Sequence, residues 1–148
     1  MTPICHEHET KIRVLVVEDR ENWRTTFCEL LDDLGYEPVQ ATCGEQFIEM
    51  APKADVIVLD ISMPMMPGDR ESKTTGLEVL LRLQSDYPGH VGIQHPIVRS
   101  MWEREDFRGT LYERTKVDND HWVSRNMPSV CLLDLITQAE RRLSERRN

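Results

Sequence analysis

The sequence predicts an α/β fold built on a doubly wound parallel sheet, and three observations support this prediction. Short apolar runs alternate with longer amphipathic stretches along the chain. The runs at 14–17 (VLVV) and 56–59 (VIVL) are apolar without interruption, as in strands covered on both faces. Glycine and proline residues separate the segments. Five strands and five helices follow one another in this way, which is typical of linked βαβ units.

The first half of the chain contains three predicted strands and two predicted helices. In order, they are a strand at 12–17, a helix at 21–35, a strand at 36–41, a short helix at 43–51 and a strand at 55–61. The first helix repeats apolar residues at helical spacing and is expected to end at Gly35. Pro38 favours an edge position for the second strand, because proline cannot donate to a neighbouring strand.

The second half begins with a loop rich in proline, glycine and charge at 62–76. The elements predicted after it are a helix at 77–89, a strand at 96–100, a helix at 103–116, a strand at 121–124 and a last helix opened by Pro128. Arg99 interrupts the apolar character of the fourth strand. We expect residues 1–10 to be a flexible N-terminal tail and residues 11–148 to form one domain.

Composition limits the function classes. A net charge of −8 disfavours a domain that mainly binds nucleic acid directly. The polar N-terminus lacks the apolar core of a signal peptide, and no run of apolar residues is long enough to span a membrane. The four cysteines form no CxxC pair, so reduced thiols in a cytoplasmic protein are expected.

Three carboxylates follow the apolar runs. Glu18 and Asp19 come directly after the first strand, and Asp60 ends the third. In a sheet of order 2-1-3-4-5 these strands are neighbours, and ligands bind beyond the carboxyl ends of such strands. Three acids in one crevice repel one another and favour a cation, and carboxylate oxygens suit Mg²⁺. The alternative is that these acids only cap the helices that follow.

Four segments also resemble a known family. "VLVVEDR", "VIVLDISMP", "PIVRS" and "HWVSRN" are similar, in order and spacing, to motifs of the receiver domain of two-component response regulators. The resemblance extends over residues 11–143 and implies a flavodoxin-like (βα)5 fold with three layers, α/β/α. The chain looks like a divergent member, and we expect it to be a stand-alone receiver without an output domain.

The resemblance implies a role for each matching acid. Asp60 matches the aspartate that accepts a phosphoryl group from a histidine kinase or phosphotransfer protein. Glu18 and Asp19 match the acidic pair that holds Mg²⁺, or Mn²⁺, together with Asp60. The backbone carbonyl of Ser62 would supply a further metal ligand.

Other matches and departures surround the acceptor. Ser100 matches the switch hydroxyl, and Trp122 matches the switch aromatic residue, although a simple core or edge aromatic is its alternative. Arg125 stands where the family has a lysine, and Asn126 where it has a cis proline, so a trans peptide is expected there. Met101 replaces a small residue and is expected either to cover Asp60 or to turn into the core.

The loop after Pro64 is longer than usual for the family. Its charged stretch, Asp69 to Thr75, lies beside the predicted site and is expected to act as a lid, to contact a partner, or to be a tolerated surface insertion.

Three function classes compete. The first is a phosphorylated signalling receiver that contacts a downstream protein or a second copy of itself. The contact would use the face of the fourth helix, fifth strand and fifth helix, with Trp102, Tyr112 and Trp122 as possible anchors. The second is a receiver-like interaction module that no longer needs phosphorylation, which the departures at Arg125, Asn126 and Met101 suggest.

The third class is an enzyme on the same fold. A phosphatase with an aspartyl nucleophile would need a second acid two residues after Asp60, where Ser62 stands. A flavin or nucleotide site would need a phosphate-binding loop after the first strand, but "EDREN" is acidic and repels phosphate. We therefore expect no enzymatic activity other than autophosphorylation and autodephosphorylation.

Overall fold

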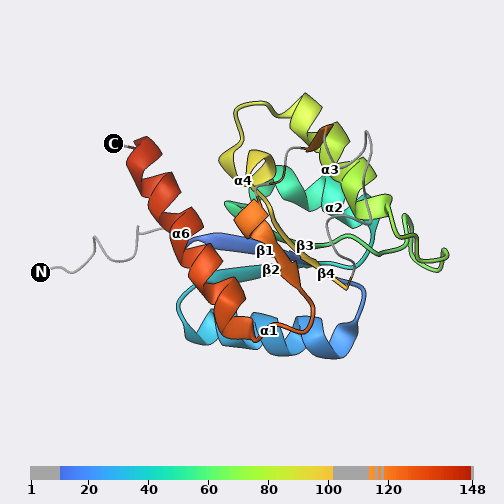
Figure 1. Ribbon diagram of the computed structural model, residues 1–148, viewed down its shortest axis with the longest axis horizontal. Coiled ribbons are helices and arrows are strands. Elements are labelled where there is room, and N and C mark those ends of the chain that lie inside the picture. Colours follow the sequence, from blue (N-terminus) through green and yellow to red (C-terminus); the bar gives the residue numbers. More distant parts are fainter. Residues whose placement is uncertain (1–10, 102–113, 116, 118, 148) are drawn as a thin grey trace, which may run out of the picture.

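Five parallel strands form one sheet in the order β2-β1-β3-β4-β5 (Figure 1). The computed structural model describes residues 11–101, 114–115, 117 and 119–147. The strands are β1 (Arg13–Val17), β2 (Glu37–Ala41), β3 (Val56–Asp60), β4 (Ile97–Ser100) and β5 (Trp122–Ser124). The helices are α1 (Glu21–Asp33), α2 (Gly44–Met50), α3 (Thr75–Asp86), α4 (Val91–Gln94) and α6 (Ser129–Arg147), with single 3₁₀ turns η2 (Ala51–Lys53) and η4 (Asn119–His121). The predicted fold class and strand order are confirmed.

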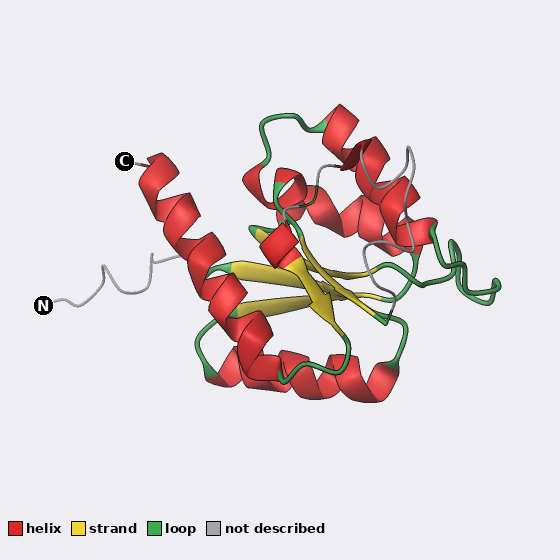
Figure 2. Cartoon of the chain, in the orientation of Figure 1, coloured by secondary structure: helices red, strands yellow, loops and turns green. Residues whose placement is uncertain are grey.

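Helices cover both faces of the sheet, which makes three layers (Figure 2). Alternate residues along a strand point to opposite faces of the sheet and so pack against different helices. Val14 and Val16 of β1 pack with α1 and α6, while Leu15 and Val17 pack with α2 and α3. Each such side chain contributes about 1.5–3 kcal/mol on full burial. Coverage on both faces explains why β1 and β3 carry continuous apolar runs rather than alternating ones.

The strand register aligns the carboxyl ends of β1 and β3. Val17 pairs with Leu59, so Glu18 and Asp60 come next on neighbouring strands. Asp60 in turn pairs with Arg99 on β4. Pro38 lies in β2, which is an edge strand as predicted.

The structure differs from the sequence prediction around α4. This four-residue helix, Val91–Gln94, lies between α3 and β4 and was not predicted. The His90 ring caps it, since its Nδ1 accepts a hydrogen bond from the Ile93 amide at 3.1 Å. The helix predicted at 103–116 lies outside the described residues except for Arg114 and Thr115, and Trp102 and Tyr112 lie outside them as well. Among the described helices, none combines the length and apolar character that crossing a bilayer requires.

Gly35 ends α1 in a left-handed conformation, with φ of +94°. Nothing lies within 4 Å of the position that a Cβ would occupy, so Gly35→Ala adds backbone strain without a clash. We expect the substitution to lower the free energy of unfolding by about 1–2 kcal/mol, measured by urea denaturation. Gly89→Ala is the matched control, because Gly89 has equally open space and no positive φ. An equal loss in both variants would contradict the assignment to backbone strain.

Candidate functional site

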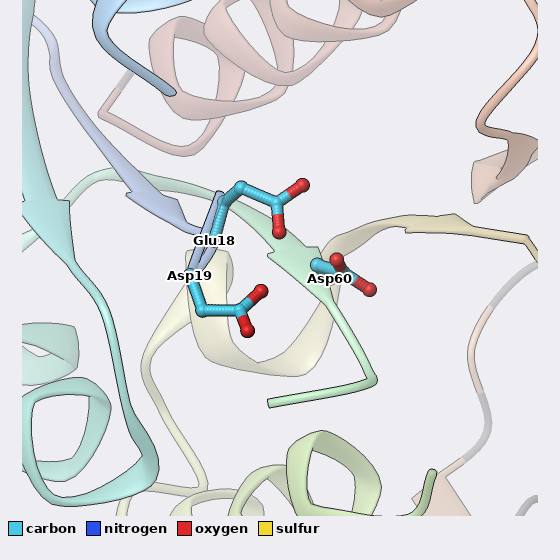
Figure 3. Close-up of side chains that lie close together, drawn as sticks. All are labelled: Glu18, Asp19 and Asp60. Carbon is cyan, nitrogen blue, oxygen red and sulfur yellow. The ribbon is translucent and has the colours of Figure 1, made fainter. Parts of the chain in front are cut away.

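Three carboxylates meet where β1 and β3 end (Figure 3). One oxygen each from Glu18, Asp19 and Asp60 lies within 4.8 Å of the other two. Glu18 is 1% exposed and Asp60 is 3% exposed, whereas Asp19 is partly buried. The sequence placed these acids at one edge, and the structure has them there as one acidic cluster.

Burial makes two carboxylates of this cluster, Glu18 and Asp19, costly to ionise. It raises the pKa of Glu18 to about 7; the neighbouring Asp60 carboxyl adds to this rise, and the Arg125 guanidinium opposes it. Burial also raises the pKa of Asp19, with a further contribution from Glu18. The cluster therefore gains from any cation that neutralises it.

Arg125 supplies one such cation from the loop after β5. Its backbone amide donates to the Ser100 carbonyl at 2.9 Å, which holds the loop against the end of β4. Its Nη2 donates to Oδ2 of Asp60 and lies 4.0 Å from Oε2 of Glu18. Burial alone would lower the pKa of Arg125, but Asp60 and Glu18 outweigh that effect and raise it. The charge expected beside Asp60 is therefore in direct contact with it.

A second arginine, Arg99 of β4, also contacts this cluster. Its Nη1 donates to Oε1 of Glu18 at 2.8 Å, and its Cζ lies 3.7 Å from the centre of the Trp23 ring. Trp23 stacks on Phe27 within α1, with ring centroids 4.9 Å apart. Sequence reasoning noticed Arg99 only as an interruption of the strand. The signal was present, since an arginine in a strand buried on both faces needs an anionic partner.

The remaining predicted residues surround these contacts. Ser100 ends β4 and is buried, and Trp122 begins β5, half-buried against the core on the α2 and α3 side. The described residues contain no cis peptide bond, so Asn126 follows a trans bond as expected. Met101 is 56% exposed, with its sulfur 3.6 Å from Nη1 of Arg125. The option that Met101 turns into the core is wrong, because Arg125 and solvent surround it instead.

Comparison with known proteins identifies the family. Residues 14–98, more than half of the chain, match the model of the response regulator receiver domain. The chain belongs to this family. The chemotaxis response regulator CheY4 of Vibrio cholerae superposes with a TM-score of 0.66 at 25% identity, covering 88% of this chain and 99% of that one.

Two further relatives extend this comparison of the receiver. The CheY-like receiver domain protein of Methanospirillum hungatei shares the fold, with a TM-score of 0.70, 18% identity, and coverage of 92% of this chain and 99% of that one. The CAI-1 autoinducer sensor kinase/phosphatase CqsS of Vibrio cholerae is 38% identical over 58 residues, which is 38% of this receiver. The match spans only 8% of the length of CqsS, so it concerns one segment of that protein.

The long loop of this receiver folds back toward the acidic cluster. Met63 and Ser72 form an antiparallel bridge, with amide-to-carbonyl distances of 3.1 and 3.2 Å. The Gly44 and Glu45 amides at the start of α2 donate to the carbonyls of Pro64 and Met65, at 2.9 and 2.8 Å. The bridge brings Glu71 beside Asp19. Burial raises the pKa of Glu71, and the Asp19 carboxylate adds to this rise.

The carboxylates of this receiver fit a divalent cation, in competition with the arginines. Oδ1 of Asp19 is buried and has no hydrogen-bond partner within the described part of the chain. An unpartnered carboxylate oxygen suits Mg²⁺ as a ligand, in a cluster whose three acids bring one oxygen each within 4.8 Å of one another. However, Oε1 of Glu18 already accepts from Arg99, and Oδ2 of Asp60 from Arg125. A metal entering this site must therefore compete with resident positive charge.

Proposed function

We propose that this receiver accepts a phosphoryl group on Asp60 from a histidine kinase or a phosphotransfer protein. The observation that carries the proposal is the position of Asp60: it ends the central strand β3, between the acids that follow β1 and the Arg125 guanidinium. A carboxylate in that position has a nucleophilic oxygen, a charge partner and a candidate metal site within one side-chain length.

The proposed transfer forms a bond between one Asp60 oxygen and phosphorus while the bond from phosphorus to the donor atom breaks. The electron pair of the broken bond leaves with the donor, which is the imidazole nitrogen of a phosphohistidine. Arg125, already in contact with Asp60, offers guanidinium donors to the new phosphoryl oxygens. In this proposal Glu18, Asp19, Asp60 and the carbonyl of Ser62 would hold Mg²⁺ or Mn²⁺, and the bound metal would supply positive charge against the phosphoryl oxygens.

The signal would pass to a protein partner. Ser100 lies buried at the end of β4, and Trp122 begins the adjacent strand β5. We propose that the phosphoryl group draws the Ser100 hydroxyl toward it and that Trp122 responds, so that a face including β5 binds a downstream protein or a second receiver. We further propose that residues 11–148 act as one signalling domain in the cytoplasm, without enzymatic turnover of other substrates and without direct contact with nucleic acid or membrane.

Acetyl phosphate tests the acceptor directly. With Mg²⁺ present, we expect the intact mass to rise by one phosphoryl group, and we expect Asp60→Asn to abolish this adduct because the amide is not a nucleophile. Asp69→Asn, which removes a carboxylate from the exposed loop, is the matched control and should leave the adduct unchanged. An adduct that persists in Asp60→Asn would assign the chemistry to another residue.

A phosphorylation-independent interaction module is the second candidate. It is favoured by the pairing of Asp60 with Arg125 and of Glu18 with Arg99, because these ion pairs already balance part of the charge that metal and phosphoryl chemistry would use. Absence of an adduct both with acetyl phosphate and with a cognate kinase would support this candidate over the first.

A further inference from the structure

Arg99 is a buried cation held on two sides. Its side chain is 8% exposed, and the carboxylate it pairs with, Glu18, is 1% exposed. The Trp23 ring covers one face of the guanidinium at 3.7 Å, and Nη1 donates to Glu18 at 2.8 Å. Trp23 is itself stacked on Phe27. Stacking and hydrogen bonding both depend on the planar guanidinium, so Arg99 is fixed in place rather than free to swing out.

The three carboxylates are therefore unequal as ligands. Asp19 has a buried oxygen without a partner in the described residues. Asp60 is bound through Oδ2 by Arg125, whose side chain is 6% exposed and comes from the loop after β5. Glu18 is bound through Oε1 by Arg99, and that guanidinium cannot withdraw without leaving a charge buried and unpaired.

A divalent cation bound by Glu18 would also lie close to the positive charge of Arg99, which contacts the same carboxylate at 2.8 Å. At the low effective dielectric of a buried site, such repulsion is strong over one side-chain length. Burial lowers the pKa of Arg99, and Glu18 and Asp60 oppose that effect. A guanidinium nevertheless keeps its proton in proteins, so the repulsion is present at every working pH.

We propose that Arg99 is a resident counter-ion that occupies the position at Glu18 which a divalent cation would otherwise use, and that it sets the metal affinity of this site. The inference rests on the proposed function only in taking the acidic cluster as the metal site. It predicts that Arg99 weakens the contribution of Glu18 to the proposed ligand set, so that the native protein binds Mg²⁺ weakly, and that neutralising Arg99 restores the full contribution of Glu18.

The test is the affinity for Mg²⁺ and Mn²⁺ of the unphosphorylated protein, measured by titration calorimetry at fixed ionic strength. We expect Arg99→Met to bind either metal about tenfold more tightly than the native protein, or more, because it removes the like charge. Arg99→Lys keeps the charge and should stay close to native. Arg82→Met removes an exposed arginine that pairs with Asp86 on α3, and it should change nothing.

A second pair of variants keeps the test decisive. Arg99→Gln is the alternative neutral variant if circular dichroism shows that the methionine variant is unfolded, and it should tighten binding as well. Adding Glu18→Gln to the neutral variant should remove the gain, because the gain is assigned to Glu18. Equal metal affinity in the native and neutral variants, or equal tightening in Arg99→Lys, would overturn the proposal.

These results are separable from those on phosphorylation. Metal affinity is read on unmodified protein, without a phosphoryl donor. If Arg99→Met binds metal more tightly but the native protein forms no adduct on Asp60, the counter-ion inference stands and the phosphoacceptor proposal is rejected. A clear adduct on Asp60, with metal affinity indifferent to Arg99, would give the reverse.

Discussion

Glu18→Met is expected to lower the free energy of unfolding by about 3–5 kcal/mol, because it leaves a buried cation without its anion. Methionine preserves the length and apolar volume of the side chain, so little packing is lost. Arg99 then remains 8% exposed beside Trp23, with its Nη1 donor unpaired. Urea denaturation in the presence of a chelator measures the loss without a contribution from metal.

A double-mutant cycle assigns this loss to the ion pair. Glu18→Met combined with Arg99→Met removes both charges. We therefore expect the double variant to lose less unfolding free energy than the sum of the two single losses, by about 2 kcal/mol or more. The same cycle at Arg13 and Glu37, a 2.6 Å pair with both side chains 47% exposed, should give less than about 1 kcal/mol. Additive losses at Glu18 and Arg99 would show that their contact contributes little to stability.

The fold could be predicted from the sequence because each strand carries its own signal. The runs at 14–17 and 56–59 face helices on both sides, and that environment is what continuous apolar residues indicate. Pro38 identified an edge strand because its missing donor is tolerated only there. The convergence of Glu18 with Asp60 then followed from strand order alone, since register fixes which chain ends meet.

Features that depend on contacts distant in sequence could not be predicted. The four residues of α4 are too few to display a helical period, and their His90 cap is not among the usual capping residues. Arg99 was visible as a misplaced charge, but its partners, Glu18 and Trp23, come from β1's end and from α1. The approach of Glu71 to Asp19 requires the pairing of Met63 with Ser72 inside a loop, which no periodicity encodes.

Phe47→Ala is expected to cost about 3–5 kcal/mol of unfolding free energy, because the ring is fully buried between α2 and the sheet and its removal leaves a cavity. Phe47→Leu keeps most of the volume and should cost less than about 1.5 kcal/mol. The loss should also reach the functional site, since the Gly44 and Glu45 amides of α2 hold the carbonyls of Pro64 and Met65 in the loop after Asp60.

Hydrogen exchange distinguishes this local loosening from a uniform loss of stability. In Phe47→Ala the Gly44 and Glu45 amides should lose more protection from exchange than the amide of Gly76. Gly76 lies in α3, and its amide donates to the Ile61 carbonyl at 2.9 Å. Equal loss at all three amides would mean that α2 and α3 open together. In that case Phe47 supports the whole α2 and α3 side of the receiver, and the loop after Asp60 depends on that layer as a unit rather than on α2 alone.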